Sequence, residues 1–276
     1  MAGTARPSAT HLDSLRRIYR VQPAPVQQIT VATFLGAPGS SLGSPAASGA
    51  GGGDYFMGAG FQGRTRYTSR PDGGLGVGTG FGDPEGGLAL EVALTSFSSV
   101  RHAPMSIGGL SFKIHHRDPQ HLLLFSAGIE NAITWGNTDG GTSVFGTMGR
   151  VFILRPAEDA PLGVLTASIG IGNGRFRPEA DVRAHRSTVG VFGGLGLRLI
   201  PAVAAVADWT GQDLDAGLTF TPFPGRGIVG SIGFADATRH AGNGPRFIMS
   251  IGYGFNAHRD NRTLSPEDLH AVYRSP

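Results

Sequence analysis

The sequence contains no cysteine, and it carries little charge. Disulfide scaffolds, thiolate zinc sites and cysteine nucleophiles are therefore excluded. Charged residues make up 16% of the chain, well below the ~25% of ordinary soluble domains. The formal net charge is only +3, and the arginines are scattered among expected turns, so nucleic-acid binding has little support.

Long hydrophobic runs are also missing. No stretch approaches 18 consecutive apolar residues, so the sequence predicts no transmembrane helix. A secretory signal is not visible either, because 15–21 is rich in arginine and 29–36 is too short and polar for a signal core. A leader missing from this sequence would explain this, and so would residence in the cytoplasm.

Glycine, by contrast, is abundant, with 45 residues in a chain of 276, against a usual share of ~7%. From Asp54 onward, apolar residues alternate with glycine or small polar residues, which is the period of a β-strand and not of a helix. The clearest example places Phe247, Met249, Ile251, Tyr253 and Phe255 on one face, opposite Ile248, Ser250, Gly252 and Gly254.

This alternation predicts an all-β fold, an antiparallel up-and-down β-barrel of the transmembrane type with about 12 strands. Most of the segments are longer than the ~5–6 residues of ordinary strands and match the ~9–11 residues of tilted membrane-spanning strands. The expected strands are 54–62, 75–82, 88–97, 105–115, 121–135, 143–155, 162–172, 187–199, 202–209, 214–222, 227–235 and 246–255.

The lengths of the connections support an outer-membrane location. The odd-numbered connections are on average longer than the even-numbered ones. Outer-membrane barrels have long external loops and short periplasmic turns, and an even number of strands leaves both termini on the periplasmic side. The expected localisation is therefore the outer membrane.

Charges in the alternating segments fall on the small-residue face, which predicts a polar barrel interior. A basic residue on the lipid face would cost ~2–4 kcal/mol at the midplane of the bilayer. Such inward charges either set an ion preference or pair with one another, and a glycine-rich interior suits lumen space or an inserted segment. The expected lumen-facing charges are Glu91, Lys113, Glu130, Arg198, Asp208 and Asp215.

Two places do not fit this division of faces. Asn131 falls in phase with the apolar face of 121–135, and 143–155 can be read in either phase, which leaves Arg150 without an assigned side. Aromatic residues near strand ends are expected to form interfacial girdles, as in membrane barrels generally. The candidates are Trp135, Trp209, Tyr253 and Phe255.

The two ends of the chain read as tails around the barrel, 54–255. The first 53 residues are rich in Gly, Ser, Pro and Ala, with a short helix at 11–20, and we expect this segment to be flexible or to enter the lumen. The C-terminal tail, 256–276, is expected to contain a short helix that Ser265 caps and Pro266 begins.

Few motifs suggest chemistry. His185 and Ser187 have the spacing of a His-x-Ser pair at the start of a strand, where imidazole could activate the hydroxyl as in barrel lipases. His115 and His116 would point to opposite faces, so they are poor co-ligands even with His121 nearby. The alternating glycines of 77–82 fit no phosphate-binding frame. We therefore expect no metal, no cofactor and no enzyme activity.

Four groups of residues form recognisable motifs: 130–136 with 138–141, 172–176, 208–214 and 246–255. Together they resemble a family of uncharacterised cyanobacterial proteins that are similar to outer-membrane, porin-like barrels. The resemblance covers about residues 75–255 and implies no reaction or substrate. The strand that ends in Phe255 also resembles the terminal signal read by the outer-membrane insertion machinery, although here 256–276 follows it.

These observations leave three hypotheses for function. The first is an outer-membrane β-barrel that acts as a passive channel or structural wall protein. The second is a soluble Gly-rich β-barrel that serves as an assembly or binding module. The third is an outer-membrane lipid-modifying hydrolase that uses His185 and Ser187. The expected partners are membrane lipid, the insertion machinery and a second copy of the chain.

Overall fold

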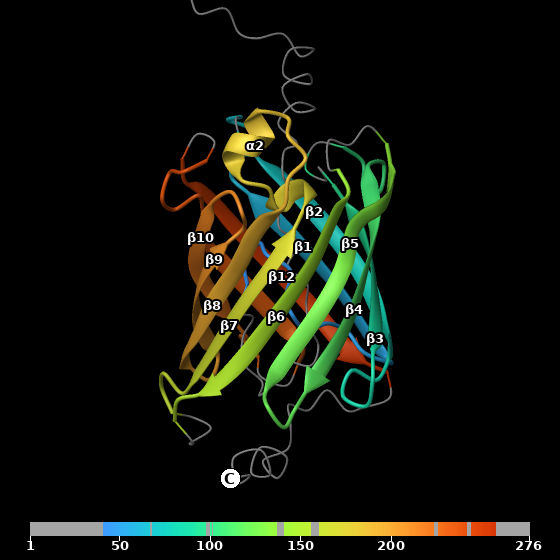
Figure 1. The fold of residues 1–276 in the computed structure, drawn as a ribbon, viewed down its shortest axis with the longest axis vertical. Coiled ribbons are helices and arrows are strands. Elements are labelled where there is room, and N and C mark those ends of the chain that lie inside the picture. The colour runs from blue at the N-terminus through green and yellow to red at the C-terminus, as the bar shows by residue number, and fades with distance from the viewer. Residues whose placement is uncertain are drawn as a thin grey trace, which may run out of the picture.

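The computed structural model describes residues 41–257, except 67, 98–99, 101, 137–140, 156–159, 224–225 and 242–243. Twelve antiparallel strands form a closed barrel in which each strand pairs with its neighbours in the sequence and β1 pairs with β12 (Figure 1). The prediction of an all-β, antiparallel up-and-down barrel with about twelve strands is therefore confirmed. The strands are β1 (Asp54–Gln62), β2 (Asp72–Gly82), β3 (Ala89–Ser96), β4 (Gly108–Asp118), β5 (Leu123–Trp135), β6 (Ser143–Ile153), β7 (Val164–Gly172), β8 (Gly190–Ile200), β9 (Val203–Trp209), β10 (Leu214–Phe220), β11 (Ile228–Ala235) and β12 (Arg246–Asn256).

The up-and-down order gives the barrel two distinct ends. At the terminal end β1 begins and β12 finishes, because Asp54 pairs with Asn256. At the opposite end, called here the loop end, lie the odd-numbered connections. The longest of them joins β7 to β8 and carries the 3₁₀ helix η2 (Gly174–Phe176) and the short helix α2 (Glu179–Arg183), which stands over this end in Figure 1.

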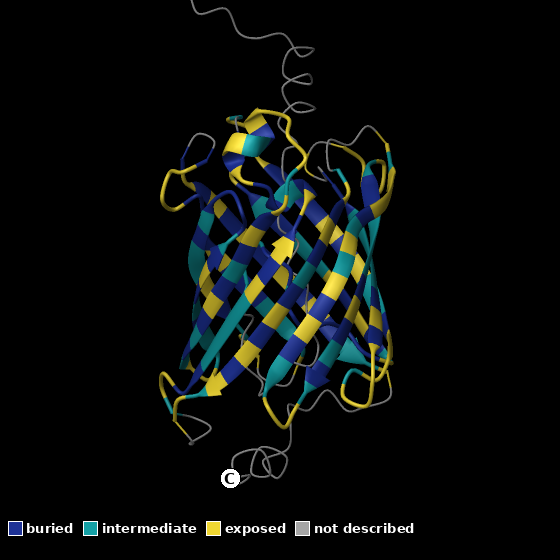
Figure 2. Cartoon of the chain, viewed as in Figure 1, coloured by how far each residue is buried: buried dark blue, intermediate teal, exposed yellow. Residues whose placement is uncertain are grey.

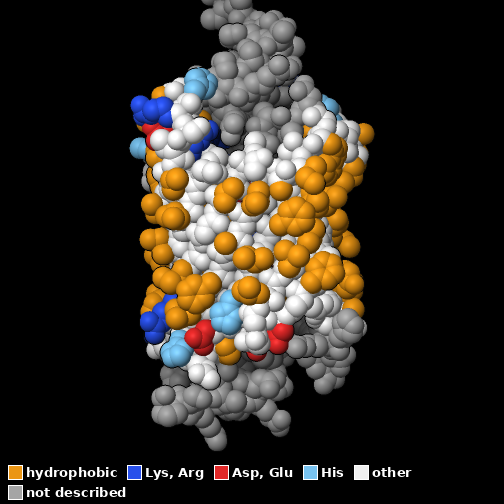
Figure 3. Space-filling model, turned by 45° about the vertical axis from the view of Figure 1, so that its right-hand side comes forward, with side chains coloured by type: hydrophobic (Ala, Val, Ile, Leu, Met, Phe, Trp, Pro, Cys, Tyr) orange, Lys and Arg blue, Asp and Glu red, His pale blue; other side chains and the backbone are white. Residues whose placement is uncertain are grey.

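The two faces of the wall differ as the alternation predicts. Along β12, buried and exposed residues alternate almost without interruption, and Figure 2 shows the same banding around the barrel. The exposed side chains are large and apolar, with Ile251 59% exposed, and they cover the middle of the wall in Figure 3. Others on this face include Met57, Val77, Ile114, Met148, Ile171, Val191, Leu195 and Ile232.

A β-bulge explains why Asn131 fell in the apolar phase of its segment. Leu110 pairs with Ile133 but Phe112 pairs with Ile129, so β5 carries extra residues opposite Ser111. Asn131 has a positive φ of 53° and turns into the barrel, where it is buried. Because the bulge adds two residues to β5, the phase is the same on either side of it, and Ile129 and Ile133 both remain exposed outside.

Arg150 takes the outward face of β6. Its neighbours Met148 and Phe152 on the same face are exposed, while Gly149 and Val151 are buried. The Arg150 guanidinium lies 5.2 Å from the centre of the Phe152 ring, and β6 ends three residues later at Ile153. An arginine close to a strand end can extend its charged group beyond an apolar surface.

The last part of the predicted flexible segment is buried inside the barrel. Residues 41–53 lie inside the barrel, with Leu42, Ala47 and Ala50 at most 5% exposed. Of the two outcomes expected for 1–53, flexibility or entry into the lumen, residues 41–53 show the second, because the lumen supplies the contacts that this segment cannot make with itself. The helices expected at 11–20 and after Ser265 lie outside the described residues. In the described part of the chain, no helix is long and apolar enough to cross a membrane.

Candidate functional site in the lumen

The lumen is occupied by residues 41–53, called here the internal segment. It is built from Gly, Ser, Ala and Pro with one leucine, so it forms a thin strand of chain without bulky side chains. Leu42 packs against Val206, Ala235 and Ile248 of the wall. Ala47 packs against Leu124, Val151 and Val164, and burial of such apolar surface contributes ~25 cal/mol per Å².

Asp208 holds the segment at the loop end. Its Oδ2 atom accepts hydrogen bonds from the backbone nitrogens of Leu42 at 3.1 Å, Gly43 at 2.7 Å and Ser44 at 2.8 Å. The Ser41 hydroxyl donates to the same oxygen at 3.1 Å. Asp208 itself is fully buried. A carboxylate that receives several backbone N–H groups is a strong anion-to-backbone contact, and it fixes this stretch of chain to β9.

A second set of contacts holds the segment near the terminal end. Glu91 Oε2 accepts a hydrogen bond from the Ala50 nitrogen at 2.8 Å, and His115 Nε2 lies 2.9 Å from the Ala50 carbonyl oxygen. Lys113 Nζ donates to the Ser48 carbonyl oxygen at 2.8 Å and forms an ion pair with Glu91 Oε1 at 3.1 Å. Charges on the wall thus pair with each other and with the backbone of the segment.

Glycines allow the segment and the wall to approach closely. A Cβ atom built on Gly80 would lie 2.2 Å from the Ala50 carbonyl oxygen, and one built on Gly49 would lie 2.8 Å from Glu91 Oε2. A Cβ on Gly149 would lie 3.0 Å from the Cβ of Ala47. Side chains larger than hydrogen at these positions would displace the segment, which accounts for part of the glycine excess of the chain.

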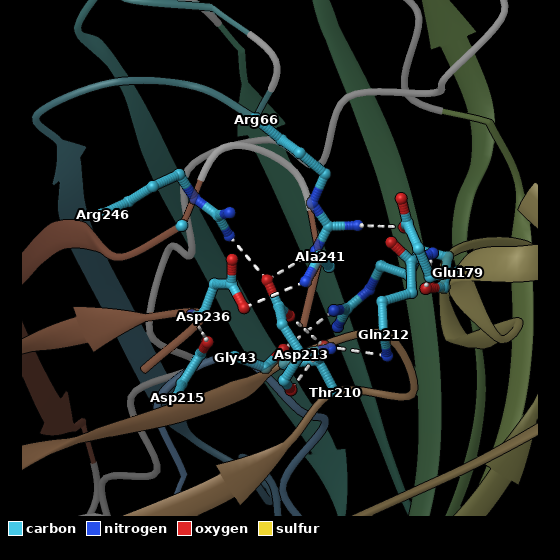
Figure 4. A network of polar contacts seen from close by, with 12 residues as sticks. Gly43, Arg66, Glu179, Thr210, Gln212, Asp213, Asp215, Asp236, Ala241 and Arg246 are labelled. Atoms are coloured by element: carbon cyan, nitrogen blue, oxygen red, sulfur yellow. Dashed lines mark hydrogen bonds and ion pairs between the residues drawn. The ribbon is translucent and has the colours of Figure 1, made fainter. Parts of the chain in front are cut away.

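A network of buried charges lies across the loop end (Figure 4). Asp213, in the turn before β10, is fully buried and binds Arg66 at 2.6 Å and Arg246 at 2.8 Å. Arg66 also lies 3.4 Å from Glu179 of α2. Burial alone would raise the pKa of Asp213, but the Arg66 and Arg246 guanidiniums hold the pKa of this carboxyl below its usual value. The network therefore ties three connections and β12 together.

Arg175 of η2 links the loop end to the internal segment. Its guanidinium binds both carboxylate oxygens of Glu130, at 2.5 and 2.8 Å, and donates to the Gly43 carbonyl oxygen at 2.9 Å. The next residue, Phe176, is fully buried and packs 4.4 Å from the ring centre of Phe192. This connection folds inward, and it closes over the point where the segment meets Asp208.

The structure places all six predicted lumen-facing charges inside the barrel. Glu91 and Lys113 pair with each other, Glu130 pairs with Arg175, and Asp208 binds the segment. Asp215 Oδ1 accepts a hydrogen bond from the Asp236 nitrogen. Arg198 is 3% exposed, and its Nε and Nη2 atoms make no hydrogen bond within the described residues. These six charges do not form a single ring, because they lie at different levels between the two ends of the barrel.

The four predicted aromatics lie near strand ends. Trp135 and Trp209 end β5 and β9 at the loop end, where the Trp135 indole donates to the Met105 carbonyl oxygen at 2.8 Å. Tyr253 and Phe255 lie near the terminal end of β12, and Phe255 stacks on Tyr55 with ring centres 5.4 Å apart. Each end of the apolar wall therefore carries aromatic side chains.

The residues considered for chemistry are not assembled into a site. β8 begins at Gly190, so His185 and Ser187 precede it, and His185 has a positive φ of 54°. The alternation argument for this pair therefore does not apply. His115 lies inside β4 and contacts the segment, whereas His121 pairs with Asp118 in the following turn. Within the described ranges there is no group of three or more metal-ligating side chains.

Several residues of the site were missed by the sequence reasoning. Arg246 shares the small-residue phase of Ile248 and Ser250, and His115 shares the phase of Lys113, so the alternation could have found both. Arg66, Arg175 and Asp213 lie in connections, where alternation gives no direction. No local signal in the sequence assigned them to the lumen.

No family model and no curated protein matches the chain. The similar solved structures include two barrels from Pseudomonas species. An outer-membrane channel from Pseudomonas putida F1 has 12% identity and a TM-score of 0.41, and covers 75% of this chain and 97% of its own. The N-terminal β-barrel domain of OprF from Pseudomonas aeruginosa has 12% identity and a TM-score of 0.22, and covers 75% of this chain and 98% of its own.

Proposed function

We propose that the chain is an outer-membrane β-barrel that acts as a structural wall protein while the internal segment fills its lumen, and as a passive channel when the segment leaves. The proposal rests on which residues of the barrel wall point outward and which point inward. Large apolar side chains cover the outside of a closed barrel, and charges and glycines line the inside. In a bilayer every strand pairing is satisfied and no edge is exposed.

The soluble alternative required the opposite arrangement. Its apolar face would form the core and its glycines would meet solvent. Instead the apolar face is outside, where Met57, Val77 and Ile171 are about half exposed. Monomeric soluble proteins rarely expose contiguous apolar patches beyond a few hundred Å². A continuous apolar wall is therefore better matched to hydrocarbon than to water.

Insertion into the outer membrane would use β12. Its outward residues end in Tyr253 and Phe255 at the terminal end of the barrel, the position expected of an insertion signal. This pattern supports the outer-membrane insertion machinery as a partner that binds β12. It also supports membrane lipid as the partner of the outer wall.

Two measurements on the full chain test the proposed function. Folded barrel should sediment with membranes, require detergent for extraction and migrate differently on gels before and after heating. In planar bilayers it should be mostly silent with brief openings, because the segment occupies the lumen. Release into buffer without detergent, with no change of migration on heating, would contradict the membrane assignment.

A further inference from the structure

The internal segment crosses the lumen once, from one end of the barrel to the other. Asp208 is the second-last residue of β9, an odd-numbered strand, so Leu42 and Gly43 lie at the loop end. Gly52 donates to the Gly82 carbonyl oxygen at 2.6 Å, where β2 ends at the terminal end. An extended chain advances ~3.3 Å per residue, so 41–53 is long enough for a single pass through a ~30 Å hydrocarbon layer.

The contacts between these points occur in the same order. Ala46 receives a hydrogen bond from Ser126, which lies near the terminal end of β5. Ala50 follows at Glu91, the third residue of β3. The segment then joins β1 at Asp54, whose backbone nitrogen donates to the Gly51 carbonyl oxygen. The chain therefore does not turn back inside the lumen.

This course has a consequence for the chain that precedes Ser41. Both ends of the wall, Asp54 and Asn256, lie at the terminal end. Ser41, however, is bound to Asp208 at the loop end and is partly buried there. We propose that the barrel is an anchor that presents the chain preceding Ser41 on the loop-end side of the membrane, which is the cell exterior in the orientation of outer-membrane barrels. This inference rests on the proposed membrane location.

The described contacts that hold the internal segment at the loop end come from the barrel. Asp208 binds three successive nitrogens of the segment, and Arg175 binds the Gly43 carbonyl oxygen between them. The backbone nitrogens of residues 42–44 and the Gly43 carbonyl oxygen thus all have partners in the barrel. These hydrogen bonds at the loop end fix the point where the chain leaves the lumen.

The absence of cysteine makes the inference directly testable. Three single variants of the full chain would be labelled in intact cells with a membrane-impermeant maleimide: Gln27→Cys, His185→Cys and Gly87→Cys. His185 is exposed in the β7–β8 connection at the loop end. Gly87 is exposed in the β2–β3 connection at the terminal end, and a Cβ there has room.

We expect Gln27→Cys and His185→Cys to be labelled in intact cells, and Gly87→Cys only after permeabilisation. If Gln27→Cys, like Gly87→Cys, is labelled only after permeabilisation while His185→Cys is labelled in intact cells, the proposal that the chain before Ser41 is presented outside is overturned. The membrane location would remain supported. Equal labelling of the His185 and Gly87 variants without permeabilisation contradicts the membrane location instead, and with it the basis of the proposal.

A disulfide test covers the case in which Gln27→Cys is not labelled at all. A Cβ on Gly43 would lie 2.9 Å from Asp215 Oδ2 at the loop end, and a Cβ on Gly149 lies 3.0 Å from Ala47 Cβ. The pair Gly43→Cys with Asp215→Cys should therefore cross-link on oxidation, as should Ala47→Cys with Gly149→Cys. A cross-link in the second pair but not in the first would contradict an exit at the loop end.

Discussion

The Oδ2 atom of Asp208 lies 2.7 Å from the backbone nitrogen of Gly43, although 165 residues separate the two in the sequence. This contact joins the wall of the barrel to the chain that fills it. Gly43 lies between two other residues whose nitrogens donate to the same oxygen. One carboxylate therefore controls how firmly the internal segment is seated at the loop end.

Replacing this carboxylate should unseat the segment. Asp208→Ala removes four hydrogen bonds to a charged group, three from backbone nitrogens and one from the Ser41 hydroxyl, each worth ~1.5–3 kcal/mol. If the seated state loses ~3 kcal/mol of stability relative to the released state, the open fraction rises ~100-fold. Single-channel recording in planar bilayers measures this open fraction. The control, Asp118→Asn at the last residue of β4 at the terminal end, should keep the wild-type opening frequency. An Asp208→Ala trace as silent as the wild type would argue against a seated plug.

A methyl group at Gly80 should have a similar effect by steric means. The Cβ of Gly80→Ala would lie 2.2 Å from the Ala50 carbonyl oxygen, a distance that requires the segment to move. Gly146→Ala is the matched control, because a Cβ there meets nothing within 4 Å. Openings should become frequent in the first variant and stay rare in the second. Identical conductance of both variants would mean that the segment does not limit the flow of ions.

A charge on the outer wall should destabilise the barrel in lipid. Ile251 lies in the middle of β12 and is 59% exposed. Ile251→Arg should lower the free energy of unfolding in bilayers by ~2–4 kcal/mol, while Ile251→Leu should change it little. Urea titration of protein in vesicles, followed by heat-modifiable migration, measures the difference. For a soluble protein the same arginine would be harmless, so equal stability of both variants speaks against the membrane.

The loop-end network should lose stability only in acid. The pKa of Asp213 is held below its usual value by Arg66 and Arg246. Its stabilisation is therefore fully present above the unfolded pKa of ~3.9 and is lost as the pH falls through the lower folded pKa. Asp213→Asn should be less stable than the wild type at pH 7. The difference in unfolding free energy between the two proteins should become smaller below pH ~4. A difference that stays constant down to the lowest pH would show that the ion pairs of Asp213 are not its cause.

The strands and their faces could be read from the sequence because they depend on a local rule. Neighbouring side chains on a strand point in opposite directions, so alternation in 246–255 is enough to separate Ile251 from Ser250. Glu91, Lys113 and Asp208 follow from the same rule. Where the rule is interrupted, as at the Asn131 bulge, alternation predicts the wrong side, because the extra residues of β5 opposite β4 break the alternation there.

The course of the internal segment was decided only in three dimensions. Nothing in the Gly, Ser, Ala and Pro of 41–53 favours an ordered structure by itself, and its order comes from wall residues such as Asp208 and Glu91 that are distant in sequence. The same is true of Asp213 and its arginines, which meet because the barrel closes. Local periodicity determined the wall, whereas the contents of the lumen depended on contacts that exist only after β1 and β12 have paired.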